Sequence, residues 1–335
     1  MTKNACTCFI IPSKMLRHLA DAAQGAERQK LLDAALLSER LRGQRSALGQ
    51  MGLFGNSAGE KRRTIYDCHR KQSQPPRGKL VRGEGAAASK DINVNEAYDN
   101  SGITYDFYSE VLKRNSIDGR GMRLDSYVHF GRDFNNAFWD GAEMVYGDGD
   151  QKLFVSFTSA LDVIAHELTH GVTQFRTPGG LDYQDQSGAL NESISDAMGS
   201  AVKQWKLKQT ASEADWLIGA GIMNPTLGKA LRSLKAPGDK SQTWAGDDQP
   251  STMSGYVEGG DVHTNSGIPN HAFYLAAIAL GGATWEKAAQ IWYRALPMLK
   301  SDASFADAAN ATIEASQSAE RAAVQTAWKK VEVIS

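Results

Sequence analysis

The sequence predicts an α+β protein in which a strand-rich part precedes a mainly helical part. Between Thr64 and Asp162, aromatic and β-branched residues are interrupted by Gly, Asp and Asn, the pattern of strands joined by turns. After Leu161 the chain is rich in alanine, and apolar residues recur at helical spacing, as in Trp285 to Leu296. We therefore expect a strand-rich lobe over residues 60–160 and a helical lobe over residues 161–335.

A separate front piece is expected ahead of these lobes. Residues 26–42 have the spacing of an amphipathic helix, with leucines among Glu, Lys and Arg. Five glycines then follow from Gly43 to Gly59 without sustained periodicity, as in a flexible connection. Residues 1–50 are thus expected to form a front piece with its linker, ending somewhere between residues 43 and 60.

Composition excludes several classes of protein. No run of 18 apolar residues indicates a membrane span, and the first twenty residues lack the apolar core of a Sec-type leader. Three cysteines are too few for a disulfide framework. Residues 1–90 carry 17 Lys and Arg against 7 Asp and Glu, although the net charge is −1. A nucleic-acid arm is one interpretation of this basic part, but with a single aromatic among residues 61–90 we expect no nucleic-acid partner.

The sequence His166-Glu167-Leu168-Thr169-His170 lies within a predicted helix from Leu161 to Gln174. Histidines four residues apart lie on one helical face, so both imidazoles can bind one metal ion. Glu167 follows its histidine by about 100° of helical rotation, which places its carboxylate beside the metal as a base. We expect one zinc ion here, and zinc in a catalytic site takes three protein ligands and one water.

Four acids downstream are candidates for the third ligand: Asp182, Asp185, Glu192 and Asp196. A histidine six residues after His170, the third ligand of one large zinc peptidase class, is absent, because Arg176 stands there. Glu192 and Asp196 are four residues apart and would share a helix face. One would bind zinc while the other would accept a hydrogen bond from a ligand histidine.

These two motifs together resemble the thermolysin family of zinc endopeptidases. The resemblance runs from about Ile92 to the C-terminus. Four further segments are similar to segments of that family and occur in the same order: Asn135-Asn136-Ala137-Phe138-Trp139, Tyr146 to Asp150, Leu231-Arg232-Ser233 and His263 to Gly267. The resemblance implies a two-lobed thermolysin-like fold with a cleft above the zinc helix. It also implies hydrolysis of peptide bonds.

The family's roles carry over to the matching residues. The resemblance makes His166, His170 and Glu192 the zinc ligands, Glu167 the base, Tyr183 and His263 the oxyanion donors, and Asp196 the partner of His166. Asn136, the backbone of Ala137, and Arg232 would bind the substrate's main chain. The pocket for the residue after the cut bond would be lined by Phe154, Phe157, Val163, Ile218 and Leu231, which implies cleavage before bulky hydrophobic residues.

One departure from the family concerns the acid that orients His263. The family usually has an Asp five residues earlier, but here Glu258 stands at that place and Asp261 replaces a glycine. The sequence leaves open which of the two acids contacts the imidazole.

The first residues are similar to the protealysin-like subset of the family, whose precursors carry a short propeptide. Ile10-Ile11-Pro12 with Leu16 and Leu19 carry this likeness, although Ser13 stands where a second proline is usual. An ordinary N-terminal arm is the alternative. The likeness implies a short propeptide. The Gly-rich connection predicts that the precursor cuts itself between Gly43 and Glu60, with bonds before Leu48, Met51, Leu53 or Phe54 favoured. The basic front and acidic body predict that the cleaved piece stays bound and inhibits the enzyme.

Calcium is expected to be absent from the family's double site. Asp162 and Asp215 match acids of that site, but Lys203 takes the place of a bridging glutamate, and Leu217 and Ala220 replace two carboxylates. The partners implied are peptide substrates, with no membrane and a monomeric state. The protein would be cytoplasmic, or exported without a Sec-type leader and secreted, as most of the family are.

The sequence disfavours two other functions. An aminopeptidase of the same zinc class would carry a G-x-M-x-N segment before the helix, and the sequence has none. A zinc protein that has lost catalysis would lack the base or the oxyanion donors, yet Glu167, Tyr183 and His263 are present. We expect the thiols of Cys6 and Cys8 not to bind the zinc ion; a thiolate ligand in the inhibited precursor is the alternative.

Overall fold

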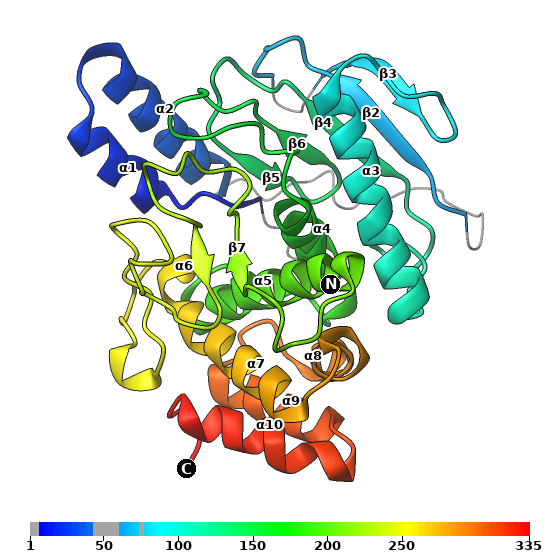
Figure 1. Cartoon of the computed structure of the whole chain (residues 1–335), viewed down its shortest axis with the longest axis vertical. Helices are drawn as coiled ribbons and strands as arrows, with labels where there is room; N and C mark the ends of the chain where they lie inside the picture. Colours follow the sequence, from blue (N-terminus) through cyan, green and yellow to red (C-terminus); the bar gives the residue numbers. More distant parts are fainter. Residues whose placement is uncertain (1–6, 43–59, 74–76) are drawn as a thin grey trace.

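The computed structural model describes residues 7–42, 60–73 and 77–335. One part of the molecule is built on a sheet, and the other is a packed group of helices, with the helix α4 lying between them (Figure 1). The predicted α+β organisation is therefore present. The Gly-rich connection expected between residues 43 and 59 lies outside the described residues.

Six strands of the described chain form one mixed sheet. Their spatial order is β1 (Cys8–Phe9), β5 (Ala137–Trp139), β6 (Met144–Tyr146), β4 (Leu124–Val128), β2 (Arg63–Asp67) and β3 (Lys79–Gly83). β2 and β6 each run parallel to β4, and the remaining pairs are antiparallel. The edge next to β5 is thus covered by a strand from the front of the chain.

A long helix interrupts the strand-rich region, which the sequence pattern did not reveal. This helix, α3 (Ile92–Asp106), continues into a π-helical turn, η2 (Phe107–Val111). Asp91 caps it by accepting a hydrogen bond from the Asn93 amide at 2.9 Å. The guanidinium carbons of Arg63 and Arg82 both lie 3.6 Å from the ring centre of Tyr98. Packing against the sheet therefore outweighs the β-branched and aromatic composition of this segment.

Two buried helices carry the sequence motifs described above. They are α4 (Leu161–Arg176), as the sequence predicts, and α5 (Asp185–Leu207). A Cβ added to Gly171 would lie 2.9 Å from the Trp139 ring, and one added to Gly199 would lie 2.7 Å from the Asp162 carbonyl oxygen. These glycines therefore let α4 approach both β5 and α5 closely, which brings the two motifs together.

The rest of the chain is mainly helical, as predicted. Its elements are β7 (Leu217–Ile218), β8 (Arg232–Ser233), η3 (Met253–Gly255), α6 (Val262–Asn265), α7 (Gly267–Leu280), η4 (Thr284–Glu286), α8 (Ala288–Ala295), η5 (Leu296–Met298), α9 (Phe305–Ala315) and α10 (Ser318–Lys330). None of the described helices is both long enough and apolar enough to cross a membrane.

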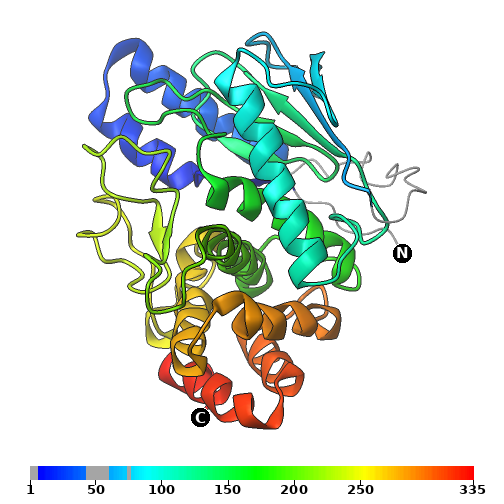
Figure 2. The same cartoon turned by 45° about the vertical axis from the view of Figure 1, so that its right-hand side comes forward.

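The front of the chain forms a helical hairpin of α1 (Ser13–Ala22) and α2 (Gly25–Arg42). The expected helix over residues 26–42 is confirmed, whereas α1 was not expected as a helix. Both helices lie beside the sheet and the segment that carries β7 and β8 (Figure 2). They bury apolar side chains, among them Met15, Leu16, Leu31 and Ala35. The hairpin is therefore packed onto the body of the protein.

Candidate active site

His166, His170 and Glu192 meet at the contact between α4 and α5. The Nε2 atoms of the two histidines are 3.0 Å apart. Glu192 Oε2 is 3.3 Å from Nε2 of His166, and Glu192 Oε1 is 3.6 Å from Nε2 of His170. All three side chains are buried. Of the four candidate acids, Glu192 alone joins the two histidines as a possible metal ligand among the described residues.

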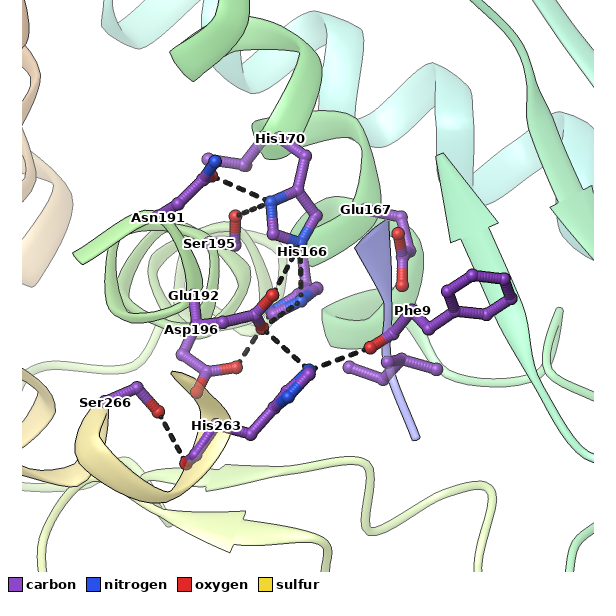
Figure 3. A network of polar contacts seen from close by, with 12 residues as sticks. Phe9, His166, Glu167, His170, Asn191, Glu192, Ser195, Asp196, His263 and Ser266 are labelled. Carbon is purple, nitrogen blue, oxygen red and sulfur yellow. Dashed lines mark hydrogen bonds and ion pairs between the residues drawn. The ribbon is translucent and has the colours of Figure 1, made fainter. Parts of the chain in front are cut away.

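The outer nitrogen of each histidine has its own partners on α5. His166 Nδ1 lies 2.8 Å from Asp196 Oδ1, while His170 Nδ1 lies 2.9 Å from Asn191 Oδ1 and 3.1 Å from Ser195 Oγ. Figure 3 shows these contacts turning both Nε2 atoms toward Glu192. When Nδ1 carries the proton, the Nε2 lone pair is free to bind a metal ion.

The three side chains fit a zinc ion. Two ligands about 2 Å from one ion lie about 3 Å apart, close to the observed separation of the histidine nitrogens. Glu192 Oε2 is buried and lacks a hydrogen-bond partner among the described residues, and a metal ion would supply one. Burial alone would raise the pKa of Glu192, but the neighbouring His263, His170 and His166 hold it well below its usual value. The set of two nitrogens and one carboxylate is that of a catalytic zinc with an open position.

Glu167 lies beside this cluster without belonging to it. Its Oε2 accepts a hydrogen bond from the Trp139 amide at 2.9 Å, and its buried Oε1 has no hydrogen-bond partner in the part of the chain that the structure describes. Burial raises its pKa well above the usual value. The free oxygen is therefore available to a water molecule beside the metal.

Tyr183 and His263 both contact Glu192 of the cluster. The Tyr183 hydroxyl donates a hydrogen bond to Glu192 Oε1. His263 Nε2 is 3.3 Å from Glu192 Oε2 and 2.9 Å from the carbonyl oxygen of Phe9. Its Nδ1 lies 2.8 Å from Asp261 Oδ1. The contact to His263 thus comes from Asp261, which answers the question that the sequence left open.

Asp196 connects the metal cluster to Arg232. Besides His166, it accepts hydrogen bonds from Arg232 Nε and Nη2 at 2.8 Å and from Asn270 Nδ2 at 2.9 Å. Burial would raise the pKa of Asp196, but the charges of Arg232 and His166 lower it. Asp196 therefore remains ionised and fixes both partners.

The main chain of the front segment is hydrogen-bonded to β5, to the side chain of Asn136 just before β5, and to the side chain of Arg232 in β8. The Ile10 amide donates to the Ala137 carbonyl at 3.2 Å, and the Ile10 carbonyl accepts from Arg232 Nη1 at 3.2 Å. The Ile11 amide donates to Asn136 Oδ1 at 3.0 Å, and the Ile11 carbonyl accepts from Asn136 Nδ2 at 3.1 Å. The three residues expected to bind a substrate's main chain therefore bind the protein's own N-terminal segment.

The five residues expected to line an apolar pocket are all buried. They belong to the hydrophobic cluster that also contains Ile10 and Ile11: Phe154, Phe157, Val163, Ile218 and Leu231. Strand pairing helps to place two of them, because the Leu231 amide donates to the Ile218 carbonyl at 2.9 Å.

Comparison with protein families decides the identity of this arrangement. The model of the thermolysin metallopeptidase catalytic domain matches residues 53–174, and that of the thermolysin metallopeptidase alpha-helical domain matches residues 179–333. The chain belongs to the thermolysin family of metallopeptidases. It is accordingly a hydrolase that acts on peptide bonds, and its metal-binding residues lie at the junction of the two matched domains.

Individual members of the thermolysin family are similar over much of the chain. An extracellular metalloprotease of Pectobacterium carotovorum subsp. carotovorum is 53% identical over 71% of this chain and 70% of its own length. Protease PrtS of Photorhabdus sp. (strain Az29) is 43% identical over 80% of this chain and 76% of its own. Among solved structures, the precursor of protealysin, a metalloproteinase from Serratia proteamaculans, matches with a TM-score of 0.86 and 44% identity, over 98% of this chain and 100% of that one.

Some residues at this thermolysin-type site were missed from the sequence. Asn191 and Ser195, which contact His170, are four residues apart in the same motif as Glu192 and Asp196, so their spacing was a usable signal. No pattern in the sequence predicted that the Trp139 amide donates a hydrogen bond to Glu167. Cys6 lies outside the described residues, and buried Cys8 is not part of the metal-ligand group.

Proposed function

We propose that the protein is a zinc endopeptidase made as an inhibited precursor. His166, His170 and Glu192 would hold the zinc ion, which when bound lowers the pKa of its water to about 7 and polarises the substrate carbonyl. Glu167 accepts the proton of the attacking water and passes it to the leaving amine. His263 and Tyr183 donate hydrogen bonds to the oxygen on which negative charge develops. Asp196 orients His166.

Substrate peptides add to β5 as an extended strand. Asn136, the backbone of Ala137, and Arg232 bind their main chain, in the way that they bind the N-terminal segment. The buried apolar residues Phe154, Phe157, Val163, Ile218 and Leu231 line the pocket for the residue after the cut bond. Cleavage is therefore proposed before Leu, Phe, Ile, Val or Met.

The N-terminal segment is proposed to be an inhibitory propeptide that comprises residues 1–50. The observation that supports this proposal is the bond between the Phe9 carbonyl and His263, because the segment holds one of the proposed catalytic groups. A peptide substrate cannot use the same donors while Phe9 to Ile11 occupy them. Removal by self-cleavage between Gly43 and Glu60 remains a proposal, since residues 43–59 lie outside the described residues.

Calcium is proposed to be absent from the family's double site, because a lysine ion pair occupies its place. Lys203 Nζ lies 2.9 Å from Asp215 Oδ2 and 3.3 Å from Asp162 Oδ2, and it donates to the Leu217 carbonyl at 3.2 Å. An ammonium group in this position repels calcium and uses the carboxylates that the ion would need. A monomeric state and secretion complete the proposal.

A peptide library tests this function directly. Mature protein, obtained after the front piece has been removed, is incubated with the library with and without a zinc chelator, and the products are sequenced. New amino termini should begin with bulky hydrophobic residues, and the chelator should abolish them. Products with no such preference, or release of single N-terminal residues, would contradict the endopeptidase proposal. A Glu167→Ala variant serves as the control for contaminating proteases.

A further inference from the structure

The N-terminal segment lies on β5 in a defined register. β1 is antiparallel to β5 and pairs Phe9 with Phe138 at the edge of the sheet. An extended peptide that adds to this edge would make the main-chain bonds that Ile10 and Ile11 now make. The segment therefore marks which peptide bond of a bound chain lies beside the metal cluster.

The carbonyl beside the cluster is that of Phe9. Its oxygen is 2.9 Å from His263 Nε2, which in turn is 3.3 Å from Glu192 Oε2. The next two carbonyls are held farther along the segment, Ile10 by Arg232 and Ile11 by Asn136. Figure 3 shows the Phe9 carbonyl turned toward His263 and its phenyl ring turned away. The centre of that ring lies 4.7 Å from the centre of the Phe138 ring.

We propose that the Phe9–Ile10 peptide bond occupies the position of the bond to be cut, and that the protein hydrolyses it in its own chain. The inference rests on the proposed function and adds a processing site to it. Ile10 would be the residue after the cut bond, and isoleucine is among the residues that the buried apolar lining favours.

The reaction consumes one water molecule and needs no other reactant. Glu167 takes a proton from the water, whose oxygen bonds to the carbonyl carbon of Phe9 while His263 donates to the carbonyl oxygen. The bond between that carbon and the nitrogen of Ile10 then breaks, and the nitrogen receives the proton from Glu167. The products are a carboxylate at Phe9 and an amine at Ile10.

This cut is separate from the one expected between Gly43 and Glu60. It frees residues 1–9 and leaves the piece that begins at Ile10 bound through Asn136 and Arg232. The inhibitory segment is therefore a bound substrate, and the product that begins at Ile10 stays bound after the cut. Its hold on His263 ends with the cut, because the Phe9 carbonyl leaves with the released peptide.

The register is tested first without metal. Residue-resolved amide exchange is measured on the metal-free full chain, in which the Ile10 and Ile11 amides should be protected. Asn136→Ala should speed exchange at Ile11 by about tenfold, because that amide loses its acceptor. Asn135→Ala is the matched control, since Asn135 bonds to Asp150 instead. Unprotected Ile10 and Ile11 amides in the unmodified protein would overturn the register.

The cut itself is tested on the zinc-loaded full chain in water enriched in heavy oxygen. Mass spectrometry should find a fragment that ends at Phe9 with one heavy oxygen in its new carboxylate, and the cut fraction should not depend on protein concentration. Ile10→Asp should slow this cut at least about 100-fold, because a charge cannot enter an apolar pocket. Ile10→Leu should preserve the cut, and Ile11→Leu is the control at the next position.

A short peptide with a Phe–Ile bond separates the two proposals. If the mature protein cuts this peptide while Phe9–Ile10 stays intact in the precursor, the further inference fails and the proposed function stands. If zinc-loaded protein cuts neither that peptide nor the library, the proposed function fails. Cleavage of Phe9–Ile10 only by a second molecule, seen when an active protein is mixed with a Glu167→Ala chain, would also overturn the inference.

Discussion

His263 Nδ1 lies 2.8 Å from the carboxylate of Asp261, although the two residues are only two positions apart. Asp261 also caps the short helix α6 by accepting a hydrogen bond from the His263 amide at 2.9 Å. One carboxylate oxygen therefore fixes both the backbone and the ring of the proposed oxyanion donor.

The first prediction follows from this contact. Asp261→Asn should lower kcat of the mature enzyme by about 10- to 100-fold, because the imidazole loses its charged partner. The fold should remain stable, since Asn also caps helices. Glu258→Gln is the matched control and should change kcat by less than about twofold. If steady-state kinetics showed a larger loss of kcat for Glu258→Gln than for Asp261→Asn, Glu258 would be the acid that orients His263 in the active form.

The second prediction separates the base from the ligands. Glu167→Ala should keep zinc and the fold but lower peptidase activity by about 100- to 10,000-fold. His170→Ala should lose zinc as well, because it removes one of three ligands. Metal content by atomic absorption and activity on a peptide substrate distinguish the two variants. Substantial activity in the Glu167 variant would refute its role.

The third prediction concerns the lysine ion pair at the family's calcium site. A calcium-selective chelator should barely shift the thermal midpoint of unfolding. Lys203→Met should lower the free energy of unfolding by about 1–3 kcal/mol, since buried Asp162 loses its cation but keeps its bond to the Val163 amide. Lys203→Glu should make the midpoint rise with added calcium. A large calcium response of the unmodified protein would contradict the proposal.

The fourth prediction concerns His129, which bridges two carboxylates away from the active site. Its ring nitrogens lie 2.7 Å from Asp148 and 2.8 Å from Asp91, and Arg70 Nε lies 4.0 Å from Asp148. The hydrogen bond to Asp148 raises the pKa of His129 to about 9, against the opposing effect of burial and with a smaller contribution from Asp91.

Because the pKa is raised on folding, this contribution to stability is complete below pH about 6.5, the usual pKa of an unfolded histidine. It is lost as the pH rises through about 9. Denaturant unfolding of the unmodified protein and of His129→Gln should therefore differ more at pH 6 than at pH 10. A constant difference across this range would show that the bridge does not depend on charge.

The fifth prediction concerns how the front piece is held after processing. The ion pairs Lys14–Asp248 and Lys30–Asp133 have the sign expected for a basic front on an acidic body, but they are exposed. The buried apolar side chains of the hairpin should therefore supply most of the binding. In gel filtration of the processed protein, the front piece should co-elute with the body at low and at high salt.

Two substitutions in the full chain separate the contribution of apolar packing from that of the ion pairs. Leu16→Asp should release the piece after processing, whereas Lys14→Ala should leave it bound. Release by salt alone would show that charge attraction, rather than apolar packing, holds the complex together.

The metal cluster was predictable because helical spacing fixes it. His166 and His170 on one helix, and Glu192 and Asp196 on another, lie where the four-residue period places them. The helix α3 was not predicted, since its sequence lacks clear amphipathic periodicity and depends on packing against the sheet. The choice of Asp261 over Glu258 depends on the start of α6, where Asp261 also accepts a hydrogen bond from the His263 amide.

The position of the N-terminal segment was equally beyond sequence pattern. β1 has two residues, and its conformation depends on pairing with Trp139 and Phe138, which lie about 130 positions away in the sequence. Ile10-Ile11-Pro12 indicated the kind of segment, but no local feature placed the Phe9 carbonyl at His263. Such long-range contacts are visible only in the folded chain.

Removal of the front piece exposes the strand β5. Its outer edge then presents unpaired amide and carbonyl groups next to a hydrolytic centre. In a helix or an interior strand, the backbone amide and carbonyl groups are already hydrogen-bonded, so such a segment cannot pair with this edge. Digestion of a protein should therefore begin in its loops and frayed ends, and partly unfolded proteins should be degraded faster than compact ones.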